Sequence, residues 1–362
     1  MSEVTPPFGQ ANAAVEGALK ELRGVLCGLP AAELSWERSS KPAAKPTVSH
    51  AHLAPLRPHN GSAKLSFLPP AKVQLVGSYL LRTTARPSLN VDLAVQIPAK
   101  CLNEKDYLDH RYTDKRLLYV AHLAASLKGY AGAAGDVQLG ALPHVQQSDW
   151  PVILLPLRGA TSDDDDEPEV WQVRIIPSLA VDALSATKLH PGRANLRGAH
   201  GTGAARGGAG PDGDGAGGAP SAAYNNLLRL ESHYGAALET MHGALARDGS
   251  GALREAIILV KLWLGVRCGA QAGGPSGFQL GLLLLHLLAR RKVSLQMGAY
   301  HMLRVLLHFL ATTDLAKTPI VLPKPAAAAA ANGNDDDESG GASGGGGGRS
   351  RIARGPLVNG EY

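Results

Sequence analysis

The spacing of apolar residues changes along the chain and separates regions with different predicted secondary structure. Between residues 64 and 190, short apolar and β-branched runs bounded by turn residues predict strands. These strands are expected at Lys72–Val76, Val91–Ile97, Val152–Leu157 and Val170–Ile176. Between the second and third strands, Glu104–Lys128 has apolar residues three or four positions apart, which predicts a helix with one buried face.

From residue 221 to residue 318 the pattern is helical, with almost no strand signal. Helices are expected at 222–247, 252–267, 278–290 and 293–311. The two patterns together predict an α+β protein, in which a mixed-sheet domain at 64–190 precedes an all-α domain at 221–318.

Three further segments flank or separate these domains. Residues 1–63 hold one helical pattern, Asn12–Leu29, followed by a linker rich in proline and serine. Residues 191–220 are rich in glycine and predict a disordered insert, because they bury too little apolar surface to offset the entropy of ordering. Residues 319–362 contain poly-Ala, an acidic run and poly-Gly, which predict a low-complexity tail.

Composition narrows the class of protein. The 362 residues include 36 Lys and Arg against 31 Asp and Glu, a net charge of +5. When the acidic run Asp163–Glu167 is set aside, both predicted domains are basic, which is compatible with contacts to a polyanion. The three cysteines are well separated and form no disulfide framework, which indicates a reducing compartment. We see no secretory signal and no apolar run long enough to span a membrane, so we expect no membrane partner.

The most informative local motif is a Gly77-Ser78 turn at the end of one predicted strand, followed by Asn90 and Asp92 on the next. A Gly-Ser turn lets backbone N–H groups and a hydroxyl approach a phosphate closely. Residues two apart on a strand point to the same face, where two acids can hold Mg²⁺ for phosphoryl transfer. The spacing resembles the nucleotidyltransferase signature, although for so short a motif taken alone a plain strand–turn–strand is the favoured explanation.

The acid set that this chemistry needs is incomplete. Asn90 occupies the first acid position, and the later strand that should supply a third carboxylate carries Arg174 instead. An asparagine contributes no negative charge, and an arginine repels a divalent cation. The run Asp163–Glu167 is better explained as a solvated acidic loop than as the missing ligands. We therefore expect no catalytic residue, no metal and no cofactor, and interpret Gly77, Ser78, Asn90, Asp92 and Arg174 as a vestigial nucleotide site.

Four basic residues are candidate RNA contacts. Arg82 and Arg86 lie between the Gly-Ser turn and the next strand, close to where a phosphate would bind. Arg254 and Lys261 are seven residues apart, which places them on one stripe of the helix predicted at 252–267. Ordinary exposed surface charge accounts for Arg82 and Arg86 equally well.

Several longer blocks resemble the Nrap family of nucleolar RNA-associated proteins, the nucleolar protein 6 family. In the first domain they are Phe67–Val73, Val76–Leu81, Arg86-Pro87, Asn90–Ala94, Lys105–Leu108, Arg111-Tyr112, Lys115-Arg116 and Leu118-Tyr119. In the second they are Lys261–Leu264, Gly277-Phe278 and Leu310–Leu315. The resemblance runs from about residue 65 to residue 315 and omits the Gly-rich insert.

The resemblance implies a nucleotidyltransferase-like domain followed by a helical domain like that of poly(A) polymerases. It also implies a non-catalytic scaffold of the small-subunit processome in the nucleolus of the nucleus, acting in 18S ribosomal RNA maturation. The implied partners are pre-rRNA, an rRNA-processing protein and casein kinase 2. Full-length members are much longer, so the chain corresponds to their front portion, as a fragment, a truncated gene model or a split protein.

Two other functions stay open from the sequence. One is an active template-independent RNA nucleotidyltransferase that uses Asp92 and Mg²⁺ with unconventional ligands. The other is a module that binds only proteins. The sequence does not decide whether a nucleotide still occupies the Gly77-Ser78 site.

Overall fold

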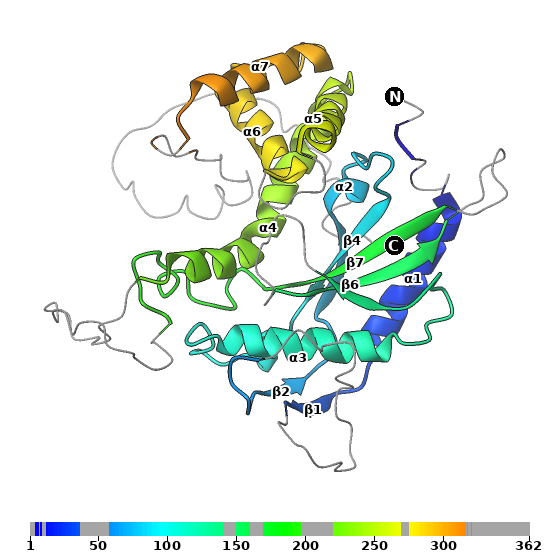
Figure 1. The fold of residues 1–362 in the computed structure, drawn as a ribbon, viewed down its shortest axis with the longest axis vertical. Helices are drawn as coiled ribbons and strands as arrows, with labels where there is room; N and C mark the ends of the chain where they lie inside the picture. The colour runs from blue at the N-terminus through cyan, green and yellow to red at the C-terminus, as the bar shows by residue number, and fades with distance from the viewer. Residues whose placement is uncertain are drawn as a thin grey trace, which may run out of the picture.

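The computed structural model describes two packed parts joined by one long helix (Figure 1). The described residues are 4–6, 8, 12–36, 58–140, 150–159, 169–196, 220–268, 275–315, 317 and 320. The first part holds two sheets with helices α1 (Ala13–Cys27) and α3 (Arg111–Ser126). The second part holds α5 (Ala252–Cys268), α6 (Gly277–Ala289) and α7 (Ala299–Thr312).

The main sheet has five strands in the order β3-β4-β7-β6-β5. Their bounds are β3 Lys72–Val76, β4 Asn90–Gln96, β5 Gln138–Gly140, β6 Val152–Arg158 and β7 Val170–Ser178. The pair β4–β7 is parallel, whereas β3–β4, β6–β7 and β5–β6 are antiparallel. The sheet is therefore mixed, as the sequence predicts, and its one parallel pair lies at the centre.

The two faces of this sheet differ in character, because successive side chains on a strand point to opposite sides. Val91, Leu93 and Val95 of β4 are buried in one core with α1 and α3. Trp171 and Val173 of β7 are fully buried in the same core. The alternate residues face the opposite side of the sheet, which the helical part covers, and this side holds the candidate site.

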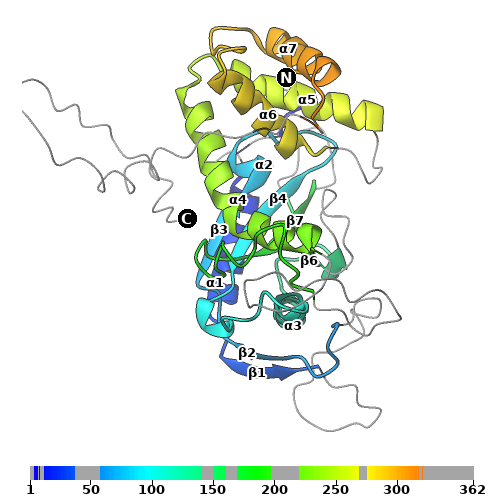
Figure 2. The same ribbon diagram turned by 90° about the vertical axis from the view of Figure 1, so that its left-hand side faces the viewer.

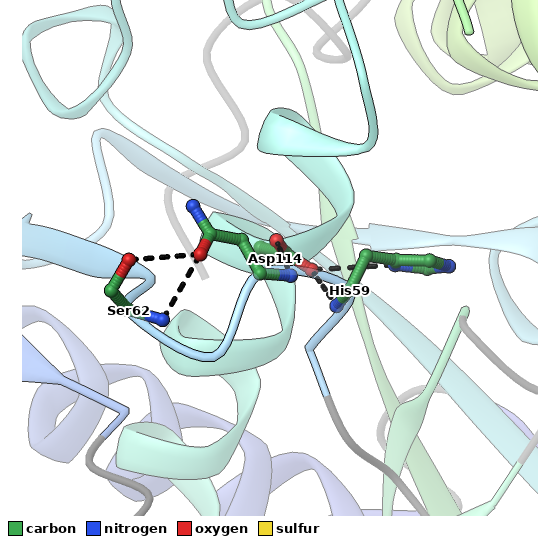
Figure 3. A network of polar contacts seen from close by, with 4 residues as sticks. His59, Ser62 and Asp114 are labelled. Atoms are coloured by element: carbon green, nitrogen blue, oxygen red, sulfur yellow. Dashed lines mark hydrogen bonds and ion pairs between the residues drawn. The ribbon is translucent and has the colours of Figure 1, made fainter. Parts of the chain in front are cut away.

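A small second sheet and the buried acid Asp114 hold in place the chain that leads into β3. Strands β1 (Ala32–Ser35) and β2 (Lys64–Phe67) pair antiparallel across the stretch predicted as a linker. Figure 3 shows the carboxylate of Asp114, near the start of α3, accepting hydrogen bonds from the backbone of this segment. The donors are the backbone N–H groups of His59 (2.7 Å) and Asn60 (2.9 Å). The Asn60 side chain in turn accepts from Ser62, which closes the turn into β2.

Helix α4 (Ala222–Arg247) belongs to both parts of the molecule. Tyr224 and Leu228 near its start are buried in the core of the sheets, whereas Leu238 and Leu245 near its end are buried with α5, α6 and α7. Figure 2 shows α4 running from beside the sheet up to the other helices. The second core also includes Val76, so the end of β3 is held between the two parts.

The predicted strands and helices are confirmed to within a few residues, with two exceptions. The helix predicted to start at Glu104 starts at Arg111, because Asp109 and His110 adopt left-handed backbone angles (φ 51° and 59°) that a right-handed helix does not accommodate. The helix predicted from residue 293 starts at Ala299, after a series of turns.

Some predictions lie wholly or mostly outside the described residues. These are the disordered insert, of which only 191–196 and 220 are described, the tail after residue 318, and the acidic run Asp163–Glu167. Within the part of the chain that the structure describes, no helix is both long enough and apolar enough to cross a bilayer.

Candidate functional site

The Gly77-Ser78 turn is formed at the point where β3 ends. Val76 is extended, Gly77 has φ +70°, and the short helix α2 (Gly77–Leu80) follows at once. Two features of position 77 require glycine. A Cβ there would lie 2.3 Å from Oδ2 of Asp92, and the positive φ would strain any other residue. Glycine therefore allows the turn to pack directly on Asp92.

Asp92 is paired with Arg174. The two residues face each other in the parallel register of β4 and β7. Arg174 donates from Nε to Oδ1 (2.5 Å) and from Nη2 to Oδ2 (2.8 Å), so both carboxylate oxygens already accept a charge-assisted hydrogen bond. The Asp92 side chain is 7% exposed and that of Arg174 is 20% exposed. The arginine thus neutralises the one carboxylate at this position.

The residues present do not fit the divalent ions that nucleotidyltransferase chemistry uses. Asn90 and Asp92 supply one negative charge between them, and Arg174 adds a positive one. No group of three or more His, Cys, Asp or Glu residues that could hold a metal ion occurs among the described residues. The side-chain nitrogen Nδ2 of Asn90 is buried and makes no hydrogen bond to a described residue.

Lys261 reaches into the same site from α5. Its Nζ donates to the Ser78 hydroxyl (2.6 Å) and to the Thr83 carbonyl oxygen (2.7 Å). Burial lowers the pKa of Lys261 to about 8, with Asp92 opposing this shift and Arg174 adding to it. The start of α6 packs on its aliphatic stem, since a Cβ at Gly277 would lie 2.7 Å from Lys261 Cγ. Lys261 therefore connects the helical part to the Gly-Ser turn.

These residues line a cavity of about 710 Å³ between the sheet and helices α4, α5 and α6. Tyr234 of α4 and Phe278 of α6 form an aromatic wall, with ring centroids 4.6 Å apart. Burial raises the pKa of Tyr234, as does the charge of Asp92, while Arg174 opposes the shift. The cavity is within the size range of small-molecule sites and combines apolar walls with a few polar groups.

A second charged group lines another part of this cavity. Arg116 of α3 donates to Glu231 of α4 (3.1 Å) and to the Pro151 carbonyl oxygen (2.7 Å), and Trp150 stacks over its guanidinium at 5.0 Å. Tyr112 also donates to Glu231 (2.8 Å). Burial raises the pKa of Glu231, and the charge of Arg116 opposes this shift. The group joins α3 to α4 and so connects the sheet to the long helix.

The structure brings together most of the residues that the sequence singled out. Gly77, Ser78, Asn90, Asp92, Arg174, Arg86 and Lys261 all line the cavity. Arg86 lies at its rim and pairs with Glu169 (2.6 Å). Arg82 is exposed outside it, and Arg254 is partly buried on α5 without lining it. Because Lys261 points inward, it does not share one surface with Arg254.

Sequence reasoning missed several residues that shape the cavity. Arg116 and Phe278 lay inside the family-like blocks without being assigned a role. Glu231 and Tyr234 follow Leu227 at helical spacing, so the three residues share one face of a helix. An acid on that otherwise apolar face was the available signal that the face lines a polar site. Trp150 had no local signal, since it precedes β6 in an irregular segment.

This architecture is a nucleotidyltransferase-like mixed sheet followed by a helical domain of the PAP/OAS-like type. The family model described as Nrap protein domain 1 matches residues 33–247, and the one described as Nrap protein PAP/OAS-like domain matches residues 252–341. The chain therefore belongs to the Nrap family. The first matched region ends with α4 and the second begins with α5.

Similarity to named relatives agrees with this family membership. Nucleolar protein 6 from Homo sapiens is 36% identical over 264 residues, which are 71% of this chain and 21% of the human protein. Nucleolar protein 6 from Xenopus tropicalis is 33% identical over 273 residues, 73% of this chain and 22% of that protein. The chain thus spans about a fifth of the length of these relatives.

A solved CdnC:HORMA-deltaN complex from E. coli MS115-1 aligns with TM-score 0.41 and 14% identity, covering 90% of this chain and 73% of that one.

Proposed function

We propose that this chain is a non-catalytic, RNA-contacting part of a ribosome-biogenesis scaffold. The observation that carries the proposal is the Asp92–Arg174 pair, in which the one carboxylate beside the Gly-Ser turn has both oxygens bonded to a guanidinium. Phosphoryl transfer of this class depends almost wholly on positioned metal ions, and one neutralised carboxylate does not hold them. The fold is then used for binding rather than for catalysis.

Family membership supports a proposed cellular role. The relatives are named Nucleolar protein 6, so we place this chain in the nucleolus of the nucleus, in maturation of small-subunit ribosomal RNA. Pre-rRNA, small-subunit processome proteins, an rRNA-processing protein and casein kinase 2 are the proposed partners. Arg82 and Arg254 lie outside the cavity and are candidates for phosphate contacts on the outer surface.

An assay of nucleotide transfer tests the non-catalytic assignment. Purified protein is incubated with labelled ATP, short RNA and either Mg²⁺ or Mn²⁺, and the RNA is resolved by length. We expect no extension above that of the Asp92→Ala variant. Extension by the unmodified protein that Asp92→Ala abolishes would establish an active nucleotidyltransferase and reject the proposal.

A second experiment tests the RNA role separately. Crosslinking and recovery of the tagged chain from cells should enrich pre-ribosomal RNA, and binding in vitro should weaken steeply with added salt because it rests on phosphate contacts. Arg82→Glu and Arg254→Glu, each made singly, should reduce recovery, whereas Arg158→Glu, at an exposed residue at the end of β6, serves as the charge-matched control. Recovery of proteins without RNA would favour a purely protein-binding module.

A further inference from the structure

We propose that Arg174 takes the place of bound divalent cations in the cavity, which therefore binds a nucleoside 5′-phosphate without metal. The ligand is a free nucleotide or a terminal residue of an RNA strand, since both present the same phosphate, ribose and base. This inference rests on the proposed non-catalytic function, because a metal-dependent enzyme would need the opposite charge at this position.

The local charges favour an anion. Arg174 and Lys261 carry two positive charges against the single negative charge of Asp92, and all three line the cavity. The other arginines at the cavity are matched by acids, Arg86 by Glu169 and Arg116 by Glu231. An excess positive charge therefore remains at the Gly-Ser turn, where it attracts a phosphate and repels a divalent cation.

Hydrogen-bond donors also remain at this end of the cavity. Arg174 uses Nε and Nη2 on Asp92, and its Nη1 makes no hydrogen bond to a described residue. Lys261 uses two of its three N–H groups on Ser78 and Thr83. The Ser78 hydroxyl accepts from Lys261, so its own proton is available for another acceptor. These three groups are the donor types that hold a phosphate through charge-assisted hydrogen bonds.

The rest of the cavity suits the nucleoside. Tyr234 and Phe278 supply aromatic surface on which a base can stack. One carboxylate oxygen of Glu231, Oε2, is buried and accepts no hydrogen bond of ordinary length from a described residue, although the Trp150 side chain lies near enough to lower the pKa of Glu231 as a donor. This oxygen can accept from a ribose hydroxyl or an exocyclic amine. A volume of about 710 Å³ is within the range of sites that hold ligands of mononucleotide size.

Calorimetric titration of the full chain with ATP, AMP and a short single-stranded RNA, each in EDTA and in Mg²⁺, tests the inference. We expect binding in EDTA that Mg²⁺ does not strengthen. Competition between ATP and the RNA would identify a shared site, and binding of ATP alone would identify the free nucleotide as the ligand; either result supports the inference. Binding that requires Mg²⁺, or no binding of any probe, would overturn it.

Variants locate the site. Lys261→Gln keeps an amide donor for Ser78 and leaves the Asp92–Arg174 pair intact, and should weaken binding at least about tenfold through loss of the charge. Arg174→Asp should abolish binding in EDTA and make it dependent on Mg²⁺. The control Arg158→Ala removes one exposed charge from the same sheet and should leave affinity unchanged. Unchanged affinity of Lys261→Gln would overturn the inference, and near-UV circular dichroism verifies that each variant is folded.

The outcomes separate this inference from the proposed function. If no probe binds the cavity while pre-rRNA still crosslinks to the chain and no RNA is extended, the inference fails and the scaffold role stands. If nucleotide binds only with Mg²⁺ and RNA is extended in a reaction that needs Asp92, both fail together.

Discussion

Two arginine–carboxylate pairs line the same cavity, and they differ in what surrounds them. The Arg116–Glu231 pair joins α3 to α4, with the arginine side chain 1% exposed and bonded also to a backbone carbonyl oxygen. The Arg174–Asp92 pair joins two neighbouring strands, and its arginine is 20% exposed. The first arginine is enclosed by the protein, while the second keeps an edge toward the cavity. Similar pairs therefore differ in how far the protein encloses the arginine: Arg116 is buried between two helices, whereas Arg174 lies where we propose that a phosphate binds.

The largest expected effect is on the enclosed pair. Arg116→Ala leaves Glu231 buried without its charge partner and should lower the free energy of unfolding by about 3–5 kcal/mol. Equilibrium urea unfolding measures the loss. The control Arg158→Ala removes an exposed arginine and should change stability by less than about 0.5 kcal/mol. Equal small losses in both variants would mean that the pair contributes no cohesion.

Next in size is the turn that packs on Asp92. Gly77→Ala combines positive φ with a Cβ that would lie 2.3 Å from Asp92 Oδ2, and should lower the free energy of unfolding by about 2–4 kcal/mol. Gly251→Ala isolates the backbone term, since Gly251 has φ +75° with open space around it, and should cost only about 1–2 kcal/mol. Equal losses would show that Asp92 moves aside easily.

A smaller loss is expected for the open pair. Arg174→Ala should lower the free energy of unfolding by about 1–3 kcal/mol, because the cavity lets water reach the unpaired Asp92. Adding Asp92→Ala should recover part of that loss, since no carboxylate is then left unpaired. A loss as large as that of Arg116→Ala would erase the distinction between the two pairs.

The smallest expected effect, when it is measured per pH unit, is a rise in stability with pH that comes from Lys261. Its pKa is about 8 in the folded protein against an ordinary 10.5, chiefly because of burial, with Asp92 and Arg174 as the charges acting on it. Between these values the unfolded chain binds a proton that the folded chain has released, so stability rises with pH there, by at most about 1.4 kcal/mol per pH unit. Below about pH 8 both states are protonated and this contribution is flat. Lys261→Gln should lack the rise, which thermal melts across the range would measure.

Local pattern predicted the elements that carry the site. Alternation and turn chemistry predict β3, β4 and β7, and so predict that Gly77, Asp92 and Arg174 lie at the ends or centres of strands. The helical patterns at 252–267 and 278–290 predict that Lys261 and Phe278 lie on helices, as they do. Because period-two alternation fixes which residues share a face, Asn90 and Asp92 were expected together, and both line the cavity.

Contacts between residues far apart in the chain could not be predicted from local sequence patterns. Arg116 and Glu231 are 115 residues apart, and nothing in either segment specifies the other. Strands β1 and β2 are four residues each and pair across the Pro- and Ser-rich stretch, so neither gives a periodic signal of its own. The predicted helix begins too early in the chain, because Leu108 continues the apolar stripe of α3 toward the N-terminus. The left-handed backbone at Asp109 and His110 instead makes α3 begin at Arg111. That Lys261 points inward follows from how the two parts pack.

The long helix α4 makes the cavity a structure of fixed width. Its first half is embedded in one core and its second half in the other, and the changeover falls near Gly235, between Leu228 and Leu238. A continuous helix, rather than a loop, therefore joins the two parts. A wider or narrower cavity requires α4 itself to bend, and the spacing between its two walls is set by the stiffness of a single helix.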